Sequence, residues 1–169
     1  SDVYKRQDPQ YVPPAVHPQD EQVRKAAEVL NAGDRVAILV GQGARGAADQ
    51  VRELADKTGA GVAKALLGKD VLSDDLPYVT GSIGLLGSRP SYEMMRDCDN
   101  LLIVGSNFPY SQFLPKFGQA RAIQIDIDGA AIGMRYPTEV NIVADAGAAL
   151  GAILPLLETK TDRKWRDTV

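Results

Sequence analysis

Cysteine and histidine are nearly absent from this sequence of 169 residues, which contains one of each, Cys98 and His17. A lone cysteine excludes an internal disulfide and a cysteine-based metal cluster. A single histidine in a proline-rich stretch excludes a histidine-rich metal site and argues against a Ser-His-Asp triad. No other acid–base or nucleophile–base pair stands out. We therefore expect neither a metal site nor a catalytic residue in this chain, and we expect Cys98 to be a small buried apolar residue.

The sequence also lacks an excess of positive charge and any long hydrophobic run. Its formal net charge is −3, which argues against nucleic acid as a partner because phosphate binding needs a basic face. No run of about 18 apolar residues is present, so we expect no membrane span, and no signal peptide is recognised. With 44% hydrophobic and 24% charged residues, the composition is that of a globular protein, and a cytoplasmic location is expected.

The chain divides into a short leader, one domain and a tail. Residues 1–7 share no pattern with the rest of the chain and are interpreted as a foreign leader. Residues 8–18 contain four prolines and are predicted to form an extended linker. Residues 19–159 have the length of one domain. Residues 160–169 are basic and are expected to be a solvated or interface tail that leads toward a further domain.

Short apolar runs alternate with amphipathic stretches along the domain. Runs that are apolar on both faces, separated by helices, are typical of a parallel sheet covered on both sides. We therefore predict a three-layer α/β fold with a Rossmann-like parallel sheet. The strands are expected at residues 35–40, 61–65, 100–104, 121–127 and 141–143. The helices are expected at residues 19–32, 44–58, 90–97 and 146–158, with residues 66–88 irregular.

A glycine-rich loop follows the first predicted strand. Gly41, Gln42, Gly43 and Gly46 lie in a GxGxxG pattern that is expected to open a helix. Such glycines let the backbone approach a diphosphate, and the helix amino terminus offers free N–H groups. The alternative is that the glycines only form a tight turn. A bound NAD would need a carboxylate after the second strand, but residues 62–66 contain none.

The fourth predicted strand supplies a carboxylate where the second strand does not. Asp126 and Asp128 follow its apolar residues at the edge where ligands of parallel sheets bind. A carboxylate there can accept two hydrogen bonds from a ribose. The alternative is that one or both of them cap the following turn, which we favour for Asp128. Asp145 is expected to be the N-cap of the last helix.

Two further loops carry residues suited to a flat ligand, although both could equally be local packing. The first is glycine-rich and apolar, with Ile83, Gly84, Leu85 and Leu86. The second combines polar with aromatic residues, in the order Ser106, Asn107, Phe108, Pro109 and Tyr110. Aromatic and aliphatic side chains from two such loops can flank a planar ring.

Taken together, these loops resemble the central domain of thiamine-diphosphate-dependent enzymes, and pyruvate oxidase and quinone-dependent pyruvate dehydrogenase most closely. Acetolactate synthase is a more distant relative. The resemblance covers residues 12–166 and rests on motifs in the family's order: GQGARG, ALLGK, GSIGLLG, GSNFPY, QIDID and VAD. It implies a six-stranded parallel sheet, with one strand near Val79 that the residues themselves do not predict.

In its flavin-containing members the family binds FAD in this domain. The resemblance implies that Gly41, Gln42 and Gly43 meet the cofactor backbone and that Asp126 holds a ribose. It also implies that the cofactor runs past two groups of residues, first Ile83, Gly84, Leu85 and Leu86, then Ser106, Asn107, Phe108, Pro109 and Tyr110.

The resemblance also implies that the remaining chemistry lies outside this chain. The family's activating glutamate belongs to an amino-terminal domain, and its Gly-Asp-Gly motif for thiamine diphosphate and Mg²⁺ belongs to a carboxyl-terminal domain. The chain alone is therefore expected not to decarboxylate a 2-oxo acid, and the parent enzyme is expected to be a homotetramer that oxidises pyruvate. Two alternatives stay open: a central domain that has lost its flavin, and a free-standing NAD-binding domain.

Overall fold

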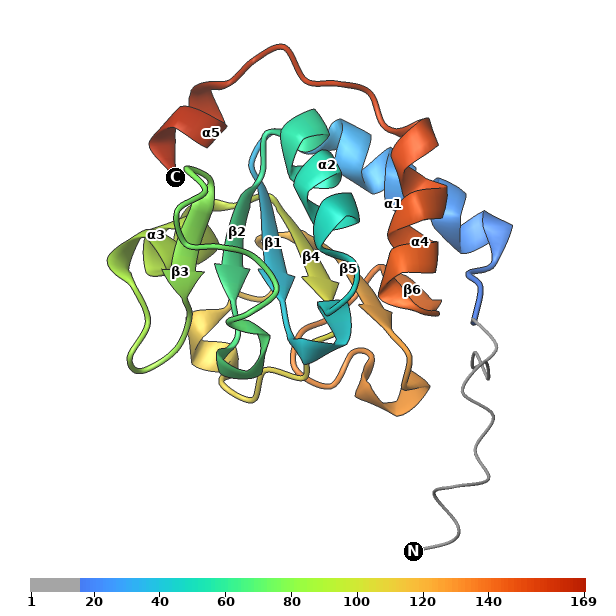
Figure 1. Ribbon diagram of the computed structural model, residues 1–169, viewed down its shortest axis with the longest axis horizontal. Coiled ribbons are helices and arrows are strands. Elements are labelled where there is room, and N and C mark those ends of the chain that lie inside the picture. The colour runs from blue at the N-terminus through green and yellow to red at the C-terminus, as the bar shows by residue number, and fades with distance from the viewer. Residues whose placement is uncertain (1–15) are drawn as a thin grey trace, which may run out of the picture.

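The computed structural model describes residues 16–169, which form a three-layer α/β fold around one parallel sheet. The predicted leader and most of the predicted linker, residues 1–15, lie outside the described residues. The six strands are ordered β3-β2-β1-β4-β5-β6, and every neighbouring pair is parallel. All strands therefore end at the same edge of the sheet, the lower edge in Figure 1. The predicted fold class is confirmed.

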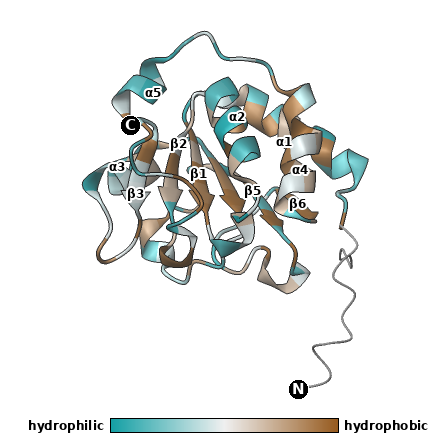
Figure 2. Cartoon of the chain, in the orientation of Figure 1, coloured by the Kyte–Doolittle hydropathy of each residue, from teal (hydrophilic) through white to brown (hydrophobic). Residues whose placement is uncertain are grey.

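Five of the six strands lie where the apolar runs predicted them, with small shifts at their ends, and β3 is the exception. They are β1 Val36–Val40, β2 Gly61–Lys64, β3 Val79–Ser82, β4 Asn100–Val104, β5 Arg121–Asp126 and β6 Val140–Val143. Every residue of β1 and β4 is buried, because these two strands occupy the middle of the sheet and are covered on both faces. Figure 2 shows these strands as predominantly hydrophobic.

The helices cover the two faces of the sheet unequally. They are α1 Asp20–Ala32, α2 Ala48–Thr58, α3 Arg89–Asp97, α4 Ala146–Ile153 and α5 Lys164–Thr168. Alternate strand residues point to opposite faces. Val36, Ile38 and Val40 share a core with α1, α2 and α4, whereas Ala37 and Leu39 share a second core with α3. The second core is completed by loop residues and by the carboxyl-terminal tail.

Two predicted helices have the wrong bounds. The second was expected to begin at residue 44, but α2 begins at Ala48 because Gln42–Ala44 forms a separate 3-10 helix. The last was expected to reach residue 158, but α4 ends at Ile153 and a 3-10 helix, Leu154–Leu156, follows. Pro155 explains this end, since proline lacks the N–H that a continuing helix needs.

β3 was not predicted from the residue pattern. Its four residues, Val79–Ser82, include one glycine and two hydroxyl side chains, and only Thr80 among them is buried. It is the edge strand beside β2, so it needs little apolar surface to pair. An edge strand of this composition has no apolar run by which it could be recognised.

The tail after α4 folds back against the edge where the strands begin, opposite the edge where they end (Figure 1). The indole Nε1–H of Trp165 donates to the Val36 carbonyl at 2.9 Å. The Arg166 guanidinium pairs with Asp56 at 2.9 Å and lies 4.6 Å from the centre of the Tyr78 ring. The tail was expected to be a solvated or interface segment, and the structure shows an interface within the chain itself.

We predict that Arg166→Ala loosens the tail and lowers the free energy of unfolding by about 1–2 kcal/mol, because it removes a half-buried ion pair and a cation–π contact. Trp165 is the only tryptophan in the chain, so its emission reports the docking of the tail directly. Urea titration measures the change in the free energy of unfolding. Fluorescence of the folded variant should show a red-shifted Trp165 emission maximum. Lys164→Ala changes an exposed neighbour and serves as the control. An Arg166→Ala protein with the emission maximum and the urea midpoint of the wild type would contradict the assignment.

Candidate functional site

A cavity of about 640 Å³ opens at the edge of the sheet where the strands end. It lies between the loops that follow β1, β2, β3 and β4, which surround the point where the strand order reverses between β1 and β4. In open parallel sheets this position is where ligands bind. Eleven of the thirteen predicted site residues line it, namely Gly41, Gln42, Ile83, Gly84, Leu85, Leu86, Ser106, Asn107, Phe108, Pro109 and Tyr110. The other two, Gly43 and Asp126, do not.

Apolar side chains form both the floor and the rim of the cavity. Ile83 and Phe108 are buried and belong to the core under α3. Phe108 meets Tyr110 edge to face, with ring centres 5.6 Å apart. At the rim, Leu85 is 75% exposed and Leu86 is 99% exposed. Large apolar side chains gathered around a concave opening are typical of a binding surface for a flat apolar group.

Few polar groups reach the cavity. Ser106 is buried, whereas Asn107 is exposed and its side-chain oxygen accepts a hydrogen bond from Arg135 Nε at 3.3 Å. The remaining polar side chains are those of Gln42, Ser82, Lys69 and Tyr110. An apolar hollow with a few separate polar groups is the usual composition of a small-molecule site.

The glycine loop is packed against the loop after β4. A Cβ on Gly41 would lie 2.5 Å from the carbonyl oxygen of Gly105, and a Cβ on Gly43 would lie 2.7 Å from the Gly105 Cα. The Gly43 N–H donates to the Gly105 carbonyl at 2.9 Å, and the Ala44 N–H donates to Gly41 at 3.0 Å. These N–H groups are therefore committed within the protein. The geometry agrees with the tight-turn alternative, and the contact with a diphosphate stays a prediction.

The loop after β2 forms a wall of the cavity that the predicted residue set did not include. The residues of this loop that line the cavity are Ala65, Leu66, Leu67 and Lys69. Two lining residues from other segments, Ser82 and Gly105, were also outside the predicted set. The loop is held to the glycine loop by Arg45, which contacts Asp70 at 3.1 Å and the Leu67 carbonyl at 3.2 Å. Its position after a parallel strand was the signal that could have identified it, since every such loop lies at the same edge.

Lys64 occupies the end of β2, where an NAD-binding domain would place a carboxylate. Its side chain is 2% exposed, and its ammonium contacts Asp74 at 2.7 Å. It also donates to the carbonyls of Lys69 at 3.0 Å and Leu72 at 2.9 Å. A buried ammonium needs such partners, and here the loop above it supplies all three.

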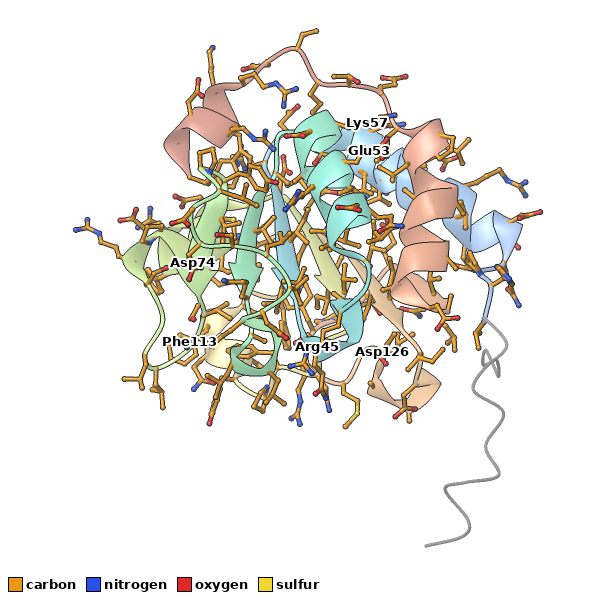
Figure 3. The ribbon with its side chains drawn as sticks, in the orientation of Figure 1. Arg45, Glu53, Lys57, Asp74, Phe113 and Asp126 are labelled. Atoms are coloured by element: carbon orange, nitrogen blue, oxygen red, sulfur yellow. The ribbon has the colours of Figure 1, made fainter. Side chains whose placement is uncertain are left out.

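Asp126 lies at the end of β5 and does not line the cavity, but it is on the same edge of the sheet, where Figure 3 shows it near Arg45. One of its oxygens, Oδ1, accepts the Asp128 N–H at 2.8 Å. Asp128 in turn accepts the Ala130 N–H at 2.9 Å, so the predicted capping role of Asp128 is confirmed. Asp145 is at the N-cap position of α4, but its side chain accepts the Val16 N–H instead of an N–H of the helix.

The described residues offer neither a metal site nor a membrane span. Within residues 16–169, no three histidine, cysteine, aspartate or glutamate side chains come together as metal ligands would. No helix in this part of the chain has the length and apolar character needed to cross a bilayer. Burial raises the pKa of the Cys98 thiol to about 12, so Cys98 is a protonated core residue at neutral pH.

The strand order and the position of the cavity are those of a doubly wound α/β domain. The chain belongs to the family described as thiamine pyrophosphate enzyme, central domain, which residues 23–153 match. This confirms the resemblance found in the sequence.

Known relatives are much longer than this chain. YdaP of Bacillus subtilis, named as a thiamine pyrophosphate-containing protein, is 36% identical over 93% of this chain and 27% of its own length. Pyruvate oxidase of Lactiplantibacillus plantarum is 30% identical over 88% of this chain and 25% of its own length. The crystal structure of benzoylformate decarboxylase from Polynucleobacter necessarius shares the fold, with a TM-score of 0.76 at 18% identity over 92% of this chain and 30% of that one.

We predict that Gly43→Ala destabilises the protein by at least about 2 kcal/mol, because the new methyl group would overlap backbone atoms that have no room to move. Gly151→Ala is the matched control. Gly151 lies in α4 with no atom near its Cβ position, so alanine there should stabilise by about 0.5–1 kcal/mol. Equal thermal midpoints for the two variants would show that the loop contact is not tight.

Proposed function

We propose that this domain binds FAD and that the whole protein is a thiamine-diphosphate-dependent enzyme that oxidises a 2-oxo acid, pyruvate being the expected substrate. Membership of the central-domain family supports the thiamine dependence. The relationship to pyruvate oxidase supports the substrate class. Thiamine diphosphate and Mg²⁺ would be held by the amino- and carboxyl-terminal domains of a homotetramer in the cytoplasm. FAD would accept the electrons released from the substrate.

The observation that carries the FAD proposal is the apolar cavity with an exposed rim. Isoalloxazine is broad, flat and largely apolar, so it needs aliphatic and aromatic walls. Ile83 and Phe108 provide a floor, and Leu85 and Tyr110 stand at the opening. Covering these side chains with a ring system would remove apolar surface from water, which is favourable by about 25 cal/mol per Å².

The position of Asp126 suits the other end of an extended dinucleotide. The cavity wall after β2 and the end of β5 are three strand spacings apart in the strand order β2-β1-β4-β5. At about 4.8 Å per spacing, this separation is roughly 14 Å along the sheet edge. A ligand with its ring in the cavity and a ribose on Asp126 must therefore be elongated and must pass over the loops of Gly41 and Gly105.

The end of β2 disfavours NAD bound in the usual way. The ribose carboxylate of that mode is replaced by Lys64, whose ammonium is enclosed by its own loop. A flavin-free structural domain is the second candidate. The committed N–H groups of Gly43 and Ala44 favour it, because they leave the glycine loop with fewer donors for a diphosphate.

We predict that Asp126→Ala weakens FAD binding by about 1.5–3 kcal/mol, the range for hydrogen bonds to a charged group. The fold should survive, since Asp126 ends a strand and is only half-buried. Titration of apo-protein with FAD measures the change. Asp128→Ala, which removes a carboxylate already used as a turn cap, is the control and should bind FAD as the wild type does. Unchanged affinity in Asp126→Ala would remove this residue from the site.

We predict that FAD raises the melting temperature of the apo-protein whereas NAD does not. A ligand that binds only the folded state stabilises it by mass action, by about 2.7 kcal/mol at a hundredfold excess over Kd. ADP controls for the half that both dinucleotides share. If NAD stabilised the protein more than both FAD and ADP, the assignment of a flavin site would be wrong. If none of FAD, NAD and ADP raised the melting temperature, the flavin-free candidate would be preferred.

A further inference from the structure

Lys69 supplies the only charged side chain among the residues that line the cavity. It makes no ion pair within 4.0 Å with any residue that the structure describes. Two acidic residues of the loop that carries Lys69 already have basic partners: Asp70 pairs with Arg45 at 3.1 Å and Asp74 pairs with Lys64 at 2.7 Å. The cavity therefore presents one uncompensated positive charge beside apolar walls.

The buried ammonium of Lys64 holds the backbone of Lys69 in place. It donates to the Lys69 carbonyl at 3.0 Å, so the backbone position of Lys69 depends on the buried side chain of Lys64. The preceding residue, Gly68, is pressed against the glycine loop, where a Cβ would lie 2.8 Å from the Gly41 Cα. Its N–H donates to the Ala65 carbonyl at 2.8 Å. The Lys69 side chain is therefore exposed on a backbone that is fixed on two sides.

We propose that Lys69 is the anion ligand of the cavity and that Lys64 is the residue that positions it. The ligand that fits has an apolar planar group at one end and a phosphate joined to it by a short polar chain, which is the chemistry of flavin mononucleotide. This inference rests on the proposed function and divides the FAD site into two parts. The flavin and its own phosphate lie in the cavity at Lys69, and the adenosine half lies toward Asp126.

The test compares three probes on the 169-residue protein: riboflavin, which has the ring without a phosphate, flavin mononucleotide, which has both, and ADP. Wild type should bind flavin mononucleotide more tightly than riboflavin. Lys69→Met should remove that preference, weakening flavin mononucleotide about fivefold, the upper value for an exposed ion pair. It should leave riboflavin and ADP unchanged. Raising the salt concentration should reduce the preference in wild type and have little effect in Lys69→Met.

Two variants serve as controls for charge. Lys116→Met removes the same charge from an exposed position outside the cavity and should bind all three probes as wild type does. Lys69→Arg keeps the charge and should retain most of the preference for flavin mononucleotide. The role of Lys69 would be overturned if Lys69→Met and Lys116→Met lost the same affinity for flavin mononucleotide. It would also be overturned if Lys69→Met lost the same affinity for riboflavin as for flavin mononucleotide.

The positioning role of Lys64 has a readout that needs no ligand. Lys64→Met should raise amide hydrogen exchange in residues 65–72 selectively, because the loop loses its anchor, and should weaken both flavins while ADP binding stays unchanged. If Lys64→Met does not fold, Asp74→Asn, which weakens only the exposed partner of the ammonium, should raise exchange in the same residues to a smaller extent. If amide hydrogen exchange in residues 65–72 were unchanged in whichever variant folds, the positioning role of Lys64 would be overturned.

Failure of the proposed function can be told apart from failure of this inference. If no flavin binds wild type, the flavin proposal is lost, and inorganic pyrophosphate then tests the anion site alone. Chemical-shift changes at residues 66–69 that are present in wild type and absent in Lys69→Met would support the anion ligand. Their absence in wild type would overturn it.

Discussion

Direct contact between the backbones of three loops is the constraint on which the site depends. Gly41 and Gly43 after β1 meet Gly105 after β4, and Gly68 after β2 meets Gly41, at distances that leave no room for a Cβ. Gly105 also needs a positive φ of 62°, which favours glycine. Because the three loops are joined in this way, the walls that they form are placed relative to one another by backbone contacts, to which the side chains of Arg45 and Lys64 add further links.

The sheet leaves only its edges available for function. Both faces of β1 and β4 are buried, so no ligand can reach the sheet from the side. At the edge where the strands begin, Trp165 and Arg166 dock the tail onto the carbonyls of β1 and of the residues around α2. The opposite edge is the one where four loops diverge around a hollow. The division of the molecule into a closed edge and an open edge follows from the parallel direction of all six strands.

The apolar runs predicted the fold well because a strand buried on both faces has little choice of residue. β4 was predicted with both of its ends, residues 100–104, and β1 to within one residue. Boundaries were wrong where a local competitor decided the backbone, a 3-10 helix in the glycine loop and Pro155 after α4. The residue pattern did not predict β3, because an edge strand forms by pairing with its neighbour and needs no apolar run of its own, and only the family resemblance implied a strand near Val79.

The candidate site was predictable as a set of loops but not in its electrostatics. A GxGxxG pattern predicts free N–H groups for a diphosphate, yet in this chain Gly43 and Ala44 direct their N–H groups to other carbonyls. The pattern is the same whether the close partner of the glycines is a phosphate or a second loop, because both require the absence of a Cβ. Where the partner is a loop, positive charge at the edge must come from a side chain, and a lysine anchored by a buried lysine meets that need.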